Sequence, residues 1–465
     1  MIDIKEQELL AHITELEAEN AFLRARIVEL EQQLAKLLDS HDSTPPSSSP
    51  TPEFVRPKLQ KKRHKKPGQK PGHPGSYRLR PTTADKIIEV PLDDCPHCHG
   101  ILENLKTCEQ YVEEIVPART TVICYRTHKG YCPNCKRTIE TRHPDQIPNR
   151  MIGSRALLLA AELKHGLGVP YRKVSTMLKS LCGLSITSGA LSQNINALAK
   201  WLKPEYESIQ SSLRQSSSVH IDETGWRLDG KSCWLWTFTN DNFTIYEVSP
   251  SRGHQVVLKQ LGEDYSGTII SDFYTAYNPL PYKQQKCLVH LLGELSQSKN
   301  DTDEFIAFRK KLTRLLRDAL RLKQRNIMNY HLADTPQETY DRLLGRIHHR
   351  LSELCCVSYQ TPDCRRLSRR LSKHSHQLFT FLEEMDVDSN NNRAERAIRP
   401  AVVTRKISGG NRSSVGSEAL GIITSIIQTC KQQGRDFVET GMEIIQRYHA
   451  NLPTGVLTSA IPVPT

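Results

Sequence analysis

Residues 217–230 read SSVHIDETGWRLDG, and residues 267–277 read GTIISDFYTAY. Each begins as a short apolar run, and the two strands that these runs predict end at Asp222 and Asp272. Two further strand-like runs, SCWLWTFTN and FTIYEVSP, and the helix-like run SRGHQVVLKQLG lie between them. Three adjacent antiparallel strands, a helix and a fourth strand are the order of a ribonuclease-H-like α/β fold. In that fold the first and fourth strands are neighbours, so we expect the two aspartates to face each other.

Paired carboxylates at neighbouring strand ends suit divalent metal ions. Mg²⁺ prefers oxygen ligands and keeps several waters, so a few carboxylates are enough to bind it. Two such ions about 3.5–4 Å apart can activate the attacking oxygen and stabilise the leaving one during phosphoryl transfer. A third acid is then required, and the candidate is Glu395, near the start of a helix predicted after SNNN at 389–392. The alternative for Glu395 is a surface ion pair with Arg399, four residues further along.

Four motifs follow one another in a specific order. They are Asp-Glu-Thr-x-Trp at 222–226, Asp-x-Tyr-x-x-Tyr at 272–277, Cys-Leu-Val-His at 287–290 and Asn-x-x-Glu-Arg-x-x-Arg at 392–399. Together with a leading leucine-heptad segment, Gly-His-Pro-Gly at 72–75 and two Cys-x-x-Cys pairs, this order resembles the insertion sequence 66 family of bacterial transposases. The resemblance extends from the N-terminal helix to about Tyr448.

The resemblance implies a DDE transposase, in which Asp222, Asp272 and Glu395 hold Mg²⁺ or Mn²⁺ and catalyse cleavage and strand transfer at the ends of an insertion sequence. It also implies that small accessory proteins encoded by the same element take part. Residues placed to contact DNA near the third acid are Arg396, Arg405 and Lys406. The Gly-Gly-Asn-Arg turn at 409–412 is either part of this DNA contact or a simple helix C-cap.

A helical insertion between the second aspartate and the glutamate is also implied by the resemblance. The sequence independently favours it, because residues 291–385 show helical periodicity and are rich in Leu, Lys and Arg. The family continues with basic residues after the histidine of the third motif, whereas Leu-Leu-Gly-Glu follows His290 here. This departure leaves DNA contacts at that turn in doubt, and the alternative for His290 is a core histidine.

The first 38 residues predict a dimerisation helix. Residues 6–38 carry a leucine at every seventh position and a second stripe, mostly isoleucine, that contains Asn20. This pattern is typical of a parallel dimeric coiled coil, so we expect a homodimer or a higher oligomer. The alternative is an amphipathic helix packed on its own domain.

Residues 39–80 predict a disordered linker that ends in a basic arm. The first part is rich in Ser, Thr and Pro and cannot bury enough apolar surface to fold. The basic run that follows is either a solvated charge run or an arm that lies along DNA phosphates. Its candidate DNA-binding residues are Lys61, Lys62, Arg63, Lys65 and Lys66.

Two Cys-Pro-x-Cys turns predict a zinc ribbon over residues 81–148. Thiolate pairs at this spacing chelate one tetrahedral Zn²⁺, and the alternating segment between them predicts paired strands. Four thiolates leave no open position on the metal, so the zinc would be structural. A redox Cys-x-x-Cys is the alternative, and a second copy makes it poor. The four candidate ligands are Cys95, Cys98, Cys132 and Cys135.

Residues 149–215 predict two or three short helices. They resemble a helix-turn-helix whose second helix runs from Thr187 to Ala199, with Thr187 or Ser188 as its cap. A plain helical bundle is the alternative. The catalytic core would then span residues 216–290 and 386–465, on either side of the insertion, in a multidomain α+β protein.

The charge balance favours a polyanionic partner. There are 63 Lys and Arg against 51 Asp and Glu, a net charge of +12, which suits double-stranded DNA. No run of about 18 apolar residues and no secretory signal occurs, so we expect no membrane partner. Thirteen cysteines in such a chain fit a reducing compartment, and we expect a cytoplasmic, nucleoid-associated protein.

Two other functions compete with transposition. A non-catalytic DNA-binding regulator with zipper, zinc ribbon and helix-turn-helix explains residues 1–215 equally well. It leaves the acid-bearing strands and the motif at 392–399 unexplained. A related metal-dependent nuclease would cleave DNA without joining it.

Overall fold

The chain divides into two units, residues 1–77 and 78–465, and all described residues belong to the second. The predicted coiled coil, linker and basic arm lie outside the described residues, as does Cys98. The computed structural model describes residues 82–459, apart from 93–94, 98, 102, 104–105, 142, 144–145, 147–149, 299 and 331–336.

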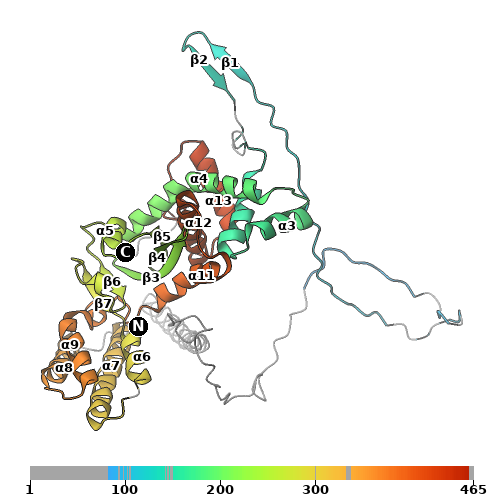
Figure 1. Cartoon of the computed structure of the whole chain (residues 1–465). Coiled ribbons are helices and arrows are strands. Elements are labelled where there is room, and N and C mark those ends of the chain that lie inside the picture. The colour runs from blue at the N-terminus through green and yellow to red at the C-terminus, as the bar shows by residue number, and fades with distance from the viewer. Residues whose placement is uncertain are drawn as a thin grey trace, which may run out of the picture. The chain divides into compact units, whose positions relative to one another are not determined.

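A five-stranded mixed sheet organises this second unit (Figure 1). Its spatial order is β5-β4-β3-β6-β7. Strands β3, β4 and β5 are antiparallel neighbours, whereas β6 and β7 run parallel to β3. The predicted neighbourhood of first and fourth strands is confirmed, and the mixed α/β fold is compatible with a ribonuclease-H-like core. The strands are β3 (Ser218–Leu228), β4 (Lys231–Thr239), β5 (Thr244–Ser249), β6 (Thr268–Ser271) and β7 (Lys283–Lys286).

The register between β3 and β6 brings the two motif aspartates together. His220 on β3 pairs with Ile270 on β6, and the same register continued by two residues sets Asp222 beside Asp272. The prediction that the first strand ends at Asp222 is wrong. Strand β3 continues to Leu228, because it keeps its ladder with β4 after its pairing with β6 has stopped. Asp222 therefore lies in mid-strand, where β3 and β6 separate.

The helices that precede the sheet in the chain meet it through the last of them, which contacts β5 and on which the other α-helices pack. They are α2 (Ser154–Ala161), a π-helical turn (Glu162–Gly166), α3 (Tyr171–Cys182) and α4 (Ser188–Arg214). Thr187 caps α4 as predicted, since its side chain accepts a hydrogen bond of 3.2 Å from the backbone N–H of Ala190. The predicted end at Ala199 is wrong, because the apolar stripe continues through buried Leu202 and Leu213.

Helices that follow the third acid motif complete the layers around the sheet. Helix α11 contacts β3 and β4, α12 contacts β5 and α4, and α13 contacts α2 and α4. Trp226 of β3 and Leu235 of β4 pack with Ile398 of α11. Trp226 and Trp236 are 2% and 0% exposed, so both are core residues. The helices concerned are α11 (Asn392–Ser408), α12 (Ser414–Gln432) and α13 (Phe437–His449), whereas α5 (Gln255–Leu261) lies between β5 and β6 in the chain and contacts α4.

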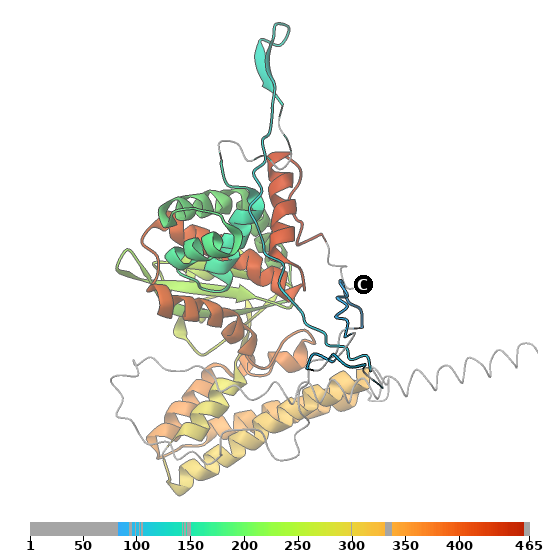
Figure 2. The same ribbon diagram turned by 90° about the vertical axis from the view of Figure 1, so that its right-hand side faces the viewer.

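The region expected to be a helical insertion folds as helices around its own apolar cluster. Phe305, Phe308 and Phe379 are buried in that cluster, together with Ile270 of β6. Helices α7 and α8 lie side by side (Figures 1 and 2). None of the described helices is both long and apolar enough to span a bilayer. The elements are α6 (Leu288–Gln297), α7 (Asp303–Tyr330), α8 (Gln337–Cys356), α9 (Pro362–Lys373) and α10 (Thr380–Glu383).

The second Cys-x-x-Cys pair sits on a hairpin of β1 (Lys129–Cys132) and β2 (Arg137–Glu140). Lys129 pairs with Glu140 and Cys132 with Arg137. Among the described residues from 82 to 128 there is no strand. Of the paired strands predicted between the two cysteine pairs, the described residues show only β1, and its partner β2 follows the second pair.

Candidate active site

The three predicted acids come from three separate elements. Asp222 lies on β3, Asp272 directly follows β6, and Glu395 lies in the first turn of α11. Burial, together with the negative charges of Glu223, Asp272 and Glu395, raises the pKa of Asp222 to about 8. The other carboxylates are thus close enough for their charges to act on Asp222. Within the described residues, no three acidic, histidine or cysteine side chains are already grouped tightly enough to hold a metal ion.

Backbone donors anchor one oxygen of each aspartate. Asp222 Oδ1 accepts a hydrogen bond of 2.9 Å from the N–H of Glu223, and Asp272 Oδ1 accepts one of 2.8 Å from the N–H of Tyr274. The other oxygen of each aspartate accepts no hydrogen bond from the part of the chain that the structure describes. These two oxygens are therefore available to a ligand.

Glu395 supplies a third carboxylate that is not satisfied by the protein. Its Oε1 atom is buried and accepts no hydrogen bond within the described residues. The Nε2 atom of His290 lies 3.5 Å from that oxygen. Glu395 therefore pairs with His290 and not with Arg399, the partner expected in the alternative interpretation. A buried oxygen without a donor, beside two further carboxylates, is a ligand set that suits a divalent cation.

His290 is a partly exposed cation beside the acids, not a core histidine. Its side chain is 43% exposed. A hydrogen bond with the Cys287 side chain raises the pKa of His290 to about 9 in spite of partial burial, and the charges of Cys287 and Glu395 raise it as well. The Nε2 atom of His290 thus faces Glu395, and the raised pKa favours the protonated ring.

Glu223, next to Asp222, belongs to a separate network. Its side chain is 3% exposed and accepts hydrogen bonds of 3.0 and 2.8 Å from the Nε and Nη2 atoms of Arg252. The hydroxyl of Tyr277 also donates to Glu223. The Arg252 guanidinium lies 4.3 Å from the ring centroid of Trp234 and 3.9 Å from that of Tyr274. Tyr274 and Tyr277, the two tyrosines of the second motif, thus both contact this ion pair.

Asn391 joins the strand of the first acid to the helix of the third. It is 1% exposed. Its Nδ2 donates to the carbonyl of Ile221 at 2.8 Å, and its Oδ1 lies 3.1 Å from Nδ1 of His220. Its backbone N–H donates to Cys287 Sγ at 3.2 Å, and its carbonyl accepts from the N–H of Glu395 at 3.2 Å. Asn391 therefore fixes the first turn of α11 against β3.

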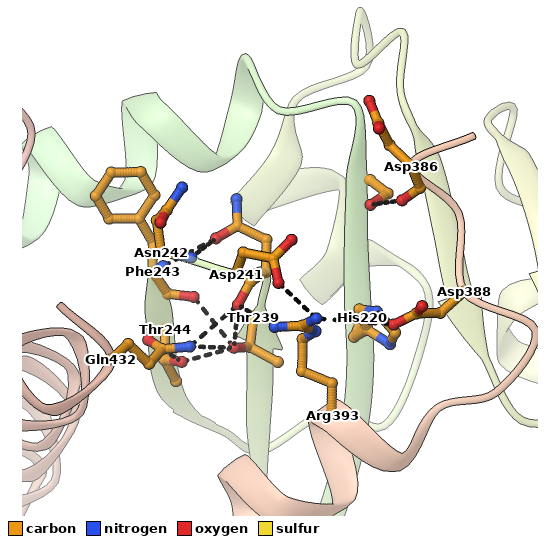
Figure 3. Close-up of polar contacts among 12 residues, drawn as sticks. His220, Thr239, Asp241, Asn242, Phe243, Thr244, Asp386, Asp388, Arg393 and Gln432 are labelled. Atoms are coloured by element: carbon orange, nitrogen blue, oxygen red, sulfur yellow. Dashed lines mark hydrogen bonds and ion pairs between the residues drawn. The ribbon is translucent and has the colours of Figure 1, made fainter. Parts of the chain in front are cut away.

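A chain of charged groups extends this connection away from the acids (Figure 3). Nε2 of His220 lies 3.3 Å from Asp388, and Arg393 of α11 lies 3.8 Å from the same carboxylate. Arg393 also makes an ion pair of 2.5 Å with Asp241 after β4. The segment that leads into α11 is thus attached to β3 and to the end of β4.

The comparison with known families agrees with this geometry. The model described as Transposase IS66 family matches residues 150–419, which is more than half of the chain and contains all three acids. The chain belongs to this family. The resemblance inferred from the motifs is confirmed, and a transposase role is supported.

Two relatives of this transposase are similar over most of their length. The uncharacterized protein y4qI of Sinorhizobium fredii is 24% identical over 416 residues, which are 80% of this chain and 74% of the relative. The uncharacterized protein y4jD of the same organism is 23% identical over 401 residues, or 78% of this chain and 76% of the relative.

The three residues of the transposase predicted to contact DNA near Glu395 differ in their surroundings. Arg396 and Lys406 are exposed on α11. Arg405 instead turns toward β3, where its Nη1 donates to Thr224 Oγ1 at 2.9 Å and to the carbonyl of Gly225. The guanidinium of Arg405 therefore holds α11 on the sheet, whereas the other two side chains face solvent.

The glycine turn after α11 is a helix cap that also joins β3. Gly409 has the left-handed φ of 72° that favours glycine at a C-cap. Asn411 donates to the carbonyl of Arg227 at 2.9 Å, and the N–H of Asp229 donates back to Asn411 at 2.9 Å. A helix C-cap, one of the two interpretations of this turn, accounts for these contacts.

Lys286 is a buried cation that the sequence did not reveal. It is 0% exposed, its Nζ donates to Ser271 Oγ at 3.1 Å, and the same atom lies 5.3 Å from the ring centroid of Tyr277. Burial lowers its pKa to about 8, while the charge of Asp272 acts in the opposite direction. Lys286 thus places a positive charge near Asp272.

The described half of the predicted zinc site has suitable thiol chemistry. Hydrogen bonds from the backbone and side chain of Cys135 lower the pKa of Cys132, which favours the thiolate that binds zinc. In the other pair, the N–H of Cys95 donates to Gly100 at 3.0 Å, and the partner Cys98 lies outside the described residues. Within the described residues, Cys95, Cys132 and Cys135 are not grouped closely enough to hold a metal ion, so the zinc site stays a prediction.

Replacing Asn391 with alanine should destabilise the unit formed by residues 78–465. The change leaves the carbonyl of Ile221 and the ring of His220 without their partner, so we expect the free energy of unfolding to fall by about 2–3 kcal/mol. Asn392→Ala, at a partly exposed neighbouring position, is the matched control and should change it by less than about 0.5 kcal/mol. Denaturant unfolding measures both values. Equal stability of the two variants would contradict the linking role of Asn391.

Proposed function

We propose that the protein is a DDE transposase that cleaves at the 3′ ends of its insertion sequence and transfers the freed ends to target DNA. The convergence of Asp222, Asp272 and Glu395 from three elements is the observation that carries this proposal. The raised pKa of Asp222 supports it, because a site that resists holding several negative charges is one that a cation would complete. The strand order supports a ribonuclease-H-like catalytic core.

Each acid has a distinct role in this proposal. Two Mg²⁺ or Mn²⁺ ions, when bound, would activate the attacking oxygen and stabilise the leaving one. Asp222 and Asp272 keep one oxygen on a backbone N–H and offer the other as a ligand. Glu395 offers its unsatisfied Oε1, and His290 orients that carboxylate. The freed 3′-hydroxyl would attack a phosphodiester of the target DNA directly and release a 3′-hydroxyl of the target strand. No covalent bond to the protein would form.

Other parts of the proposal concern assembly. A dimer formed through residues 6–38 would hold two element ends at once, and the basic arm would lie along their phosphates. A structural zinc ion on Cys95, Cys98, Cys132 and Cys135 would hold the two cysteine pairs together. The rival functions are a DNA-binding regulator without catalysis and a nuclease that cuts but does not join.

The Asp272→Asn variant should lose cleavage and strand joining. Loss of one ligand removes several kcal/mol of transition-state stabilisation, so we expect both rates to fall at least about 100-fold. The assay uses the full chain, Mg²⁺ or Mn²⁺, and a duplex that carries the DNA flanking its gene. Asp264→Asn, an exposed acid shortly before β6, is the matched control and should retain activity.

Three outcomes of this assay would contradict the proposal in different ways. Cleavage by Asp272→Asn at the wild-type rate would remove Asp272 from the catalytic centre. Cutting without joining would favour the nuclease. Binding of the duplex by both proteins, with no cleavage in either metal ion, would favour the regulator.

Zinc content gives a separate prediction for the cysteine pairs. The purified wild-type chain should contain about one zinc ion, because four thiolates complete a tetrahedral site. The double variant Cys132→Ser, Cys135→Ser should contain almost none, whereas Cys356→Ser, at an exposed cysteine of α8, should match the wild type. Elemental analysis by mass spectrometry measures this. A double variant with full zinc content would refute the predicted ligand set.

A further inference from the structure

A groove runs along the pair of helices α7 and α8. Two adjoining hollows of about 490 and 530 Å³ lie between these helices, and both are lined by Asp318 and Arg350. The α7 residues of the groove are at 311, 314, 318, 321 and 325, and the α8 residues include 343, 346, 350, 353 and 357. Steps of three and four place each set on one helix face. The hollows therefore form one continuous groove between two parallel stripes of side chains.

Basic side chains dominate this groove. Asp318 and Glu353 are its two acids. Asp318 already makes ion pairs with Arg350 at 2.8 Å and with Arg321 at 3.7 Å. The remaining four basic residues make no ion pair within the described residues. The six basic residues of the groove are Lys311, Arg314, Arg321, Arg325, Arg346 and Arg350.

We infer that this groove binds the phosphate backbone of double-stranded DNA. The distance along α7 from position 311 to position 325 is about 21 Å at the helical rise of 1.5 Å per residue. Phosphates on one strand of B-DNA rise by about 3.4 Å each along the axis while they wind around it, so a straight stripe of this length can lie against a few consecutive phosphates. A row of exposed arginines fits a linear polyanion, because each guanidinium can bind a phosphate with two hydrogen bonds.

This inference rests on the proposed function for its choice of DNA as the partner. It adds a surface on the helical insertion, built from residues other than the three acids. Contacts to phosphates carry no base sequence, so the groove would hold any duplex and would set position and affinity rather than sequence preference.

The salt dependence of DNA binding tests the inference. The probe is a 30-base-pair duplex of arbitrary sequence, bound by the full chain without added Mg²⁺ and measured by fluorescence anisotropy. The groove variant replaces Arg314, Arg325 and Arg346 with Gln. The matched control replaces Lys310, Arg317 and Arg342 with Gln, three exposed residues of the same helices that do not line the groove.

We expect the groove variant to bind about 10- to 100-fold more weakly at moderate salt. The slope of log affinity against log salt should become shallower by about 2 to 3, since each lost phosphate contact contributes about 0.9. The control variant should change both quantities much less, and both variants should melt within about 2 °C of the wild type because the replaced side chains are exposed.

Equal binding by groove variant and wild type would overturn the inference and favour an acidic protein as the partner of this groove. Equal weakening by both variants would also overturn it, because net charge alone would then explain the loss. If DNA binding depended on the groove but the chain cleaved no DNA, the inference about the groove would stand and the proposed function would be refuted.

Discussion

Asp222 is half-buried on the central strand, within the electric field of three other acids. Burial and these charges together raise its pKa to about 8, which favours a proton or a bound cation on the carboxyl group. Several features of the surrounding fold keep the acids close in spite of this repulsion. Strand β3 runs beside β6 as far as His220 and then separates from it, which opens space at Asp222. Helix α11 adds Glu395 from the far end of the chain.

The charges around the acids are balanced by residues on several sides. Arg252 neutralises Glu223 on its own network, and Lys286 supplies a buried positive charge near Asp272. Asn391 connects β3, the turn at Cys287 and the start of α11 through hydrogen bonds alone. Contacts from several elements therefore offset the electrostatic repulsion among the acids.

Much of the core was predictable because its signals are local. Apolar runs indicate β3 to β6, and an oxygen-bearing residue before α4 correctly predicts Thr187 as its cap. Strand β7 was missed, since its sequence Lys-Gln-Gln-Lys is polar. The side chains after Lys283 are buried because they find partners far along the chain, as when Gln285 donates to the carbonyl of Leu378 at 3.0 Å. Sequence patterns do not show such long-range hydrogen bonds.

The acid motif shows the same limit at the site. Glu395 was found because it belongs to a motif, whereas Asn391 is one of three consecutive asparagines that the sequence does not distinguish. Only the packing of α11 on β3 selects it. Arg405 was predicted to face DNA from its position in a basic run, but the nearby Thr224 and Gly225 hold it on the sheet. A charged residue's neighbours in space, not in sequence, decide its partner.

Titration of the full chain with Mn²⁺, followed by the electron paramagnetic resonance signal of the free ion, tests the convergence of the three acids most directly. Wild-type protein should bind Mn²⁺, and Asp222→Asn, Asp272→Asn and Glu395→Gln should each bind it at least about tenfold more weakly, a loss of about 1.4 kcal/mol or more. Glu418→Gln, at an exposed glutamate of α12, should bind as the wild type does. Equal Mn²⁺ binding by all five proteins would contradict a shared metal site.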